Sequence, residues 1–87
     1  MLTIYNYAVY FTISASKYFD YLGISRYKVI ELIEQHWNDK KVESKRKNKY
    51  FILCRYGGKY MKIRFRIYEE ENKVLVIAAE IFTKVRK

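Results

Sequence analysis

The 87-residue chain contains one cysteine, Cys54, one histidine, His36, and no proline. A single cysteine excludes an intramolecular disulfide and a cluster of metal-binding thiolates. The longest uninterrupted apolar run, Val74 to Ala79, is far too short to span a bilayer. The first residues, Met1 to Tyr7, lack the basic segment and the apolar core of a signal peptide. These absences predict an intracellular, cytoplasmic protein that does not enter a membrane.

The sequence also lacks the motifs of the common phosphate, metal and nucleophile sites. The paired glycines, Gly57 and Gly58, are not followed by the Lys-Ser/Thr and the helix of a phosphate-binding loop. A zinc site would need more His and Cys ligands than the chain contains. His36 adjoins Trp37 near the end of a predicted helix, where packing is a commoner role than catalysis. We therefore expect no metal site and no cofactor.

Basic residues are present in large excess. Lys and Arg number 18 against nine Asp and Glu, which gives a formal net charge of +9. A charge of this size on one small domain creates a field that attracts polyanions. Nucleic acid is the commonest such partner, and an anionic membrane or an acidic protein are the alternatives. The ten Tyr residues suit both half-buried strand surfaces and stacking on bases.

The hydrophobic pattern predicts a single α+β domain over residues 1–87. Residues 2–13 alternate in two phases and are rich in β-branched and aromatic side chains, so they predict one N-terminal strand. Ser14 or Ser16 can then cap a short helix that ends at Gly23. Ser25 caps a second helix, whose apolar stripe runs to Trp37.

The rest of the chain predicts a sheet. Residues 38–49 are polar and predict a loop with room for a short strand around Val42. Residues 50–56, 59–68 and 74–83 predict a three-stranded antiparallel meander, with Gly57-Gly58 as its first hairpin turn. Both helices are expected to pack on one face of this sheet.

Residues 59–68 carry the most informative pattern. Met61, Ile63, Phe65 and Ile67 share one side of the predicted strand, which we expect to face the helices. The open side then carries Tyr60, Lys62, Arg64, Arg66 and Tyr68. Cations neutralise phosphates and Tyr rings stack on unpaired bases, so this row predicts a face that binds single-stranded RNA. An ordinary solvated outer face also carries such residues.

Two further basic segments could extend this surface. Residues 40–49 carry Lys45, Arg46 and Lys47 at their centre and are opposed only by Glu43. The C-terminal tail adds Lys84 and Arg86. Three basic segments at separate places in the chain favour nucleic-acid binding. The sequence does not say whether they share one surface.

The segment TISASKYFDYLGIS, residues 12–25, followed by VIELIE, residues 29–34, resembles small domains of the RelE/ParE toxin superfamily. Those domains carry Ser-x-His-Ala and Arg-Gly-Ile-Ser before a helix and continue into a basic sheet. Gly23-Ile24-Ser25 and the apolar periodicity match this pattern, whereas Ser14-Ala15 stands where His-Ala would fall. The resemblance implies an mRNA endonuclease that is paired with an antitoxin and contacts phosphate through Arg64 and Arg66.

Arg64, Arg66 and Tyr68 are the candidate catalytic residues of such a nuclease. The arginines would stabilise a pentacovalent phosphate without a metal, and a Tyr would move a proton. Two alternatives stay open. One is a non-catalytic DNA- or RNA-binding accessory protein of a virus or mobile element. The other is a protein-interaction module that binds an acidic partner or forms a homodimer through its sheet edges.

Overall fold

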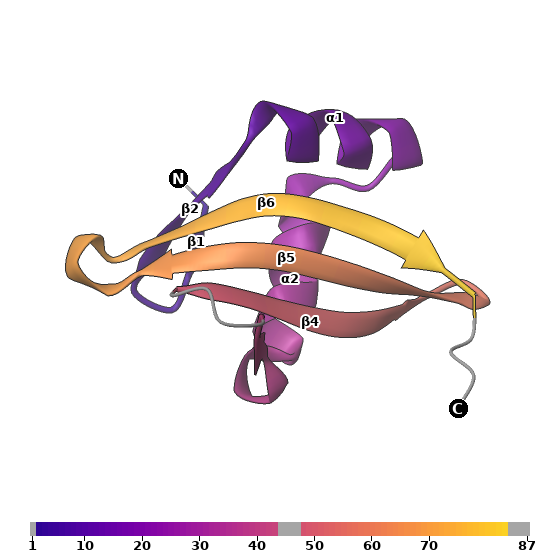
Figure 1. Ribbon diagram of the computed structural model, residues 1–87. Coiled ribbons are helices and arrows are strands. Elements are labelled where there is room, and N and C mark those ends of the chain that lie inside the picture. The colour runs from indigo at the N-terminus through magenta and orange to yellow at the C-terminus, as the bar shows by residue number, and fades with distance from the viewer. Residues whose placement is uncertain (1, 44–47, 84–87) are drawn as a thin grey trace.

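The computed structural model describes residues 2–43 and 48–83, which form one mixed sheet and two α-helices (Figure 1). Five predicted site residues lie outside the described residues: Lys45, Arg46, Lys47, Lys84 and Arg86. The elements in chain order are β1 (Thr3–Ile4), β2 (Tyr7–Phe11), α1 (Ile13–Leu22), α2 (Arg26–Gln35), the 3-10 helix η1 (Trp37–Asp39), β3 (Lys41–Val42), β4 (Lys49–Tyr56), β5 (Lys59–Tyr68), the 3-10 helix η2 (Glu69–Glu71) and β6 (Lys73–Phe82).

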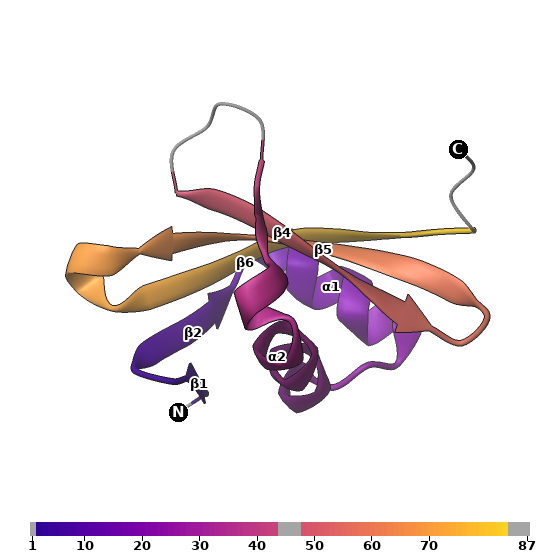
Figure 2. The ribbon, with the colours of Figure 1, turned by 90° about the horizontal axis from the view of Figure 1, so that it is seen from below.

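The sheet has six strands in the order β1-β2-β6-β5-β4-β3. Strand β2 runs parallel to β6, and every other neighbouring pair is antiparallel. Both helices lie on the same side of the sheet, as the view in Figure 2 shows. The opposite side is called the open face below. No helix within the described ranges is long and apolar enough to cross a membrane.

The predicted α+β class with two helices is confirmed, but the predicted strand number is wrong. The sheet contains six strands, not an N-terminal strand and a three-stranded meander. The N-terminal segment folds back at Tyr5, whose φ of 53° lies in the left-handed region, so that Ile4 pairs with Tyr7. This turn shifts the side chain phase, because Ile4 and Val9 both face the core. The two-phase alternation in the sequence therefore marks two short strands.

The core lies between the helices and the inner side of the sheet. Strand β5 at its centre buries alternate residues, Met61, Ile63, Phe65 and Ile67, each at most 2% exposed. Helix α1 contributes Ala15 and Phe19, and helix α2 contributes Val29, Ile30 and Ile33. Cys54 belongs to the same core, where burial raises the pKa of its thiol. The predicted inward side of β5 is thus correct.

Helix α1 begins two to four residues earlier than the sequence predicted. Its N-cap is Thr12, whose Oγ1 accepts a hydrogen bond from the Ala15 amide at 3.1 Å. The same hydroxyl donates to the carbonyl oxygen of Ile77 on β6 at 3.0 Å. Thr12 is preferred over Ser14 or Ser16 because it also joins the helix to the sheet. Gly23, with φ 75°, ends α1, and Ser25 caps α2, as predicted.

Replacement of Thr12 tests this double role. We expect Thr12→Ala to lower the free energy of unfolding by about 1–2 kcal/mol, because the cap and the bond to β6 are both lost. Thr12→Ser keeps the hydroxyl and should lose less than half of that. Urea denaturation followed by circular dichroism measures both variants. Equal losses for Ala and Ser would show that the hydroxyl contributes nothing.

Candidate nucleic-acid interface

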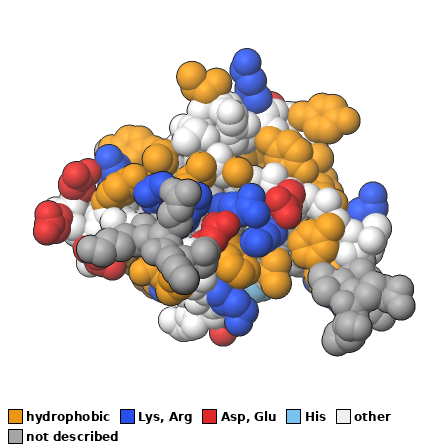
Figure 3. Space-filling view, in the orientation of Figure 1, with side chains coloured by type: hydrophobic (Ala, Val, Ile, Leu, Met, Phe, Trp, Pro, Cys, Tyr) orange, Lys and Arg blue, Asp and Glu red, His pale blue; other side chains and the backbone are white. Residues whose placement is uncertain are grey.

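The open face carries the predicted row of β5. Its five residues, Tyr60, Lys62, Arg64, Arg66 and Tyr68, all lie half-buried on the side of β5 away from the core. Figure 3 views this face and shows Lys and Arg side chains gathered over the middle of the sheet, with hydrophobic side chains around them. The alternation of a regular strand thus places these five residues where the sequence predicted them.

Neighbouring strands add cations to the same face. Strand register places further side chains beside those of β5, because residues opposite one another across a sheet point to the same side. Seven described cations lie on this face against three carboxylates that pair with them, those of Glu43, Glu80 and Glu71. The cations are Lys41, Lys49, Arg55, Lys62, Arg64, Arg66 and Lys73. The positive charge is therefore concentrated on the side that the helices leave open.

Arg64, at the centre of the row, already forms ion pairs with two carboxylates. Its Nε lies 3.2 Å from Oε2 of Glu43, and its Nη1 lies 3.4 Å from Oε1 of Glu80. The contact to Glu43 is close enough for charge attraction but lacks hydrogen-bond geometry, since Nε and Glu43 Oε1 have no hydrogen-bond partner among the described residues. A phosphate would have to compete with two carboxylates for Arg64. Arg64 is thus less available to a phosphate than a cation without a carboxylate partner, and its predicted role in phosphate contact stays a prediction.

Lys62 and Arg66 flank Arg64, each about 7 Å along the strand from it. In the described ranges no carboxylate forms an ion pair with either residue. The Lys62 ammonium lies 4.3 Å from the ring centroid of Phe51, a cation–π contact that does not neutralise its charge. These two cations are the ones most available to phosphate.

Aromatic rings lie at both ends of the row. At one end Tyr60 stacks on Phe82 with centroids 6.0 Å apart, and the Arg55 guanidinium lies 6.0 Å from the Tyr60 ring. At the other end Lys73 lies 4.9 Å from the ring of Tyr68. A hydrogen bond with the Glu71 carboxylate, 3.0 Å away, raises the pKa of Lys73 and holds it charged. The face therefore offers stacking surfaces at its ends and cations between them.

The same face offers little for catalysis. Two of its carboxylates are paired with Arg64, that of Glu71 is paired with Lys73, and its described part carries no imidazole. Among the described residues no group of three His, Cys, Asp or Glu side chains could hold a metal ion. Arg66 and Tyr68 could contact a phosphate and a base, and the carboxylates that share a pocket with Tyr68, those of Glu69, Glu70 and Glu71, lie on η2 at the end of the row. The arrangement suits binding of a polyanion better than its cleavage.

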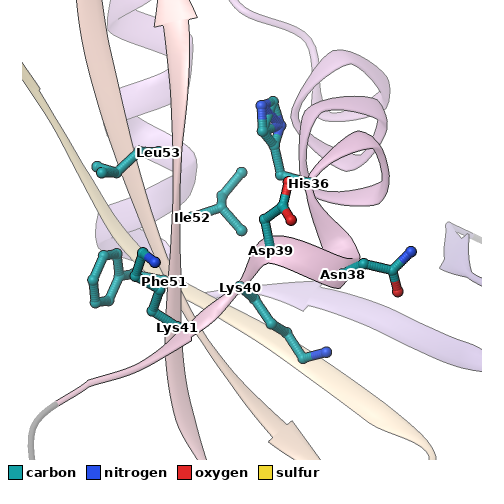
Figure 4. Close-up of a pocket in the computed structure, with 8 residues that line it drawn as sticks. All are labelled: His36, Asn38, Asp39, Lys40, Lys41, Phe51, Ile52 and Leu53. Carbon is teal, nitrogen blue, oxygen red and sulfur yellow. The ribbon is translucent and has the colours of Figure 1, made fainter.

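A second site, which was not predicted from the sequence, is a pocket of about 450 Å³ at the outer edge of β4 (Figure 4). It is lined by His36, Asn38, Asp39, Lys40, Lys41 and residues Phe51, Ile52 and Leu53 of β4. His36 Nδ1 lies 3.2 Å from the Leu32 carbonyl oxygen, which fixes the ring at the end of α2. The signal in the sequence is the run of polar side chains directly after the second helix.

Comparisons of the chain with protein-family models, with curated proteins and with solved structures find no match. The resemblance to RelE/ParE toxins therefore stays a prediction. What the protein does has to be inferred from the two sites themselves, the open face and the pocket beside β4.

Proposed function

We propose that the open face binds single-stranded nucleic acid, RNA in the first instance, and does so without cutting it. The observation that carries the proposal is that seven cations stand against three carboxylates on one side of the sheet. Phosphates bind such a surface because Lys and Arg release condensed counterions from the nucleic acid. Single strands are favoured because Tyr60 and Tyr68 can stack only on unpaired bases.

The geometry suggests separate roles along the row. Lys62 and Arg66 would bind backbone phosphates, since neither is tied to a carboxylate within the described part of the chain. Tyr60 and Tyr68 would stack on bases at the two ends. Arg64 would hold the strands together through Glu43 and Glu80 and would bind phosphate only when these release it.

Binding of labelled single-stranded RNA to single variants tests the proposal. We expect Lys62→Ala and Arg66→Ala each to weaken binding about eightfold at about 50 mM salt, the worth of one phosphate contact. Each should also lower the slope of log Kd against log salt by about 0.7. Fluorescence anisotropy over a salt series measures both quantities, and gel analysis of the same samples measures cleavage.

Lys17→Ala is the matched control, because Lys17 is an exposed cation of the same charge on α1. It should change neither affinity nor slope beyond a small effect of net charge. Equal weakening by Lys17→Ala and Arg66→Ala would mean that charge alone attracts RNA and that the open face is not the site. RNA cleavage that disappears in Arg66→Ala and Tyr68→Phe would replace the binding proposal with the nuclease interpretation.

A further inference from the structure

The outer edge of β4 is only partly covered. Strand β3 pairs with Tyr50 and Phe51, and strand pairing on this side ends there among the described residues. Strand β4 continues to Tyr56, and its pairing with β5 is regular throughout. Part of a long, regular strand is thus left without a neighbour on one side.

The backbone groups at this edge can be assigned from two hydrogen bonds. The Lys49 carbonyl oxygen accepts a hydrogen bond from the Glu43 amide at 2.8 Å, so the backbone N–H and C=O groups of Lys49 point toward β3. The carbonyl oxygen of the preceding residue, Asn48, accepts a hydrogen bond from the Ile67 amide at 2.9 Å, so this backbone carbonyl points toward β5. Because the direction alternates along a strand, Leu53 and Arg55 direct their N–H and C=O groups outward. Such groups are a template for an added strand.

The pocket beside this edge provides room for the side chains of an added strand. Figure 4 shows Ile52 and His36 on one side of β4 and Leu53 on the other. Side chains on the inner side of an added strand would enter the pocket between β4 and η1. Those on the outer side would lie beside Leu53, whose side chain is 43% exposed.

The positive charge around the edge of β4 favours a negatively charged segment as the added strand. Lys41 and Arg55 are exposed at the two ends of this edge, and Lys62 lies opposite Leu53 on β5. Asp39 is the one carboxylate among the residues that line the pocket. A second copy of the chain, with its own net charge of +9, would bring like charges together. An acidic strand would instead be attracted.

We propose that the edge of β4 at Leu53 and Arg55 binds an extended acidic segment of a partner protein, which adds a strand to the sheet. Carboxylates on the outer side of that segment would meet Lys41, Lys62 and Arg55. Small apolar side chains on its inner side would fill the pocket. The proposal does not need nucleic acid to bind, although Lys41, Lys62 and Arg55 also belong to the open face and an acidic segment would compete with RNA for them.

A synthetic peptide of about eight residues, in which Glu alternates with Val, is the probe. We expect it to slow hydrogen exchange of the Leu53 and Arg55 amides by at least about tenfold. The amides of β5 should not change. The matching Lys-Val peptide should bind at least about tenfold more weakly, because its charges repel those of the edge. Exchange measured by NMR and affinity measured by anisotropy give the two readouts.

Variants at Leu53 separate backbone pairing from side-chain contact. Leu53→Pro removes an outward N–H without removing a bond to β5 and should abolish peptide binding. Leu53→Thr keeps that N–H and should bind within about threefold of the parent. Leu53→Glu, which leaves the backbone intact, should weaken the Glu-Val peptide and strengthen the Lys-Val peptide. An unchanged circular dichroism spectrum and a cooperative urea transition show that each variant is folded.

Three results would overturn the proposal. One is unchanged exchange at Leu53 and Arg55 at saturating peptide. Another is equal affinity for the Glu-Val and Lys-Val peptides. The third is protection of the same amides that rises with protein concentration in the absence of peptide, which would assign this edge to a second copy of the chain.

Discussion

Phe65→Ala is expected to lower the free energy of unfolding by about 3–5 kcal/mol, the cost of truncating a buried aromatic side chain. Phe65 has no exposed surface and lies on β5 at the centre of the sheet. Its ring stacks between Trp37, at 6.0 Å, and Tyr50, at 6.2 Å. A small domain has only about 5–15 kcal/mol of stability, so this variant should be close to unfolded at room temperature. Urea denaturation measures the loss.

Two controls make this prediction specific. Phe65→Leu keeps most of the volume and should cost less than about 2 kcal/mol. Tyr21→Ala truncates an aromatic ring that is 84% exposed and should stay within about 0.5 kcal/mol of the parent. A loss at Phe65→Ala no larger than that at Tyr21→Ala would show that the stacked cluster of Trp37, Phe65 and Tyr50 does not hold the core.

Glu43→Gln combined with Glu80→Gln is expected to strengthen RNA binding about 20-fold at about 50 mM salt. The change frees Arg64 for a phosphate, which accounts for about eightfold. It also removes two negative charges from the open face. Both amides are close in size to the carboxylates they replace, so the sheet should keep its register. Anisotropy with labelled single-stranded RNA measures the gain.

Addition of Arg64→Ala to this double variant should cancel most of the gain, because the freed phosphate ligand is then absent. The pair Glu34→Gln and Glu70→Gln changes net charge equally on α2 and η2 and is the matched control. If the control pair strengthens binding as much, the gain comes from net charge and not from Arg64. If Arg64→Ala has no effect in the double variant, Arg64 never contacts phosphate.

Local features of the fold could be read from the sequence. Gly23 and Ser25 define the corner between the helices through a left-handed cap and a side-chain cap, and both depend on residues close in sequence. The alternation of apolar and polar residues on β5 also depends only on residues close in sequence, and it predicts which side chains face the core. The pairing of β2 with β6 could not be predicted, because it joins Ala8 to Lys73 and no local pattern specifies it.

The candidate site likewise has a part that could be predicted from the sequence and a part that could not. The row from Tyr60 to Tyr68 follows from alternation along one strand. The ion pairs of Arg64 do not follow from this alternation, because Glu43 and Glu80 come from segments on either side of β5. The pocket beside β4 was hidden for a similar reason, since it forms between η1 and a strand that follows a polar loop. Contacts between distant segments therefore decide which predicted cations are available.

The parallel pairing of β2 with β6 has a consequence for synthesis of the chain. The ribosome makes β2 before both helices and β6 after β4 and β5, so the two strands cannot meet until all the elements between them have been made. Phe19 and Ile33, which are buried in the final fold, leave the ribosome before the sheet that covers them exists. The nascent chain thus exposes an apolar helical surface until β4, β5 and β6 have been made, and it is prone to aggregation during that interval.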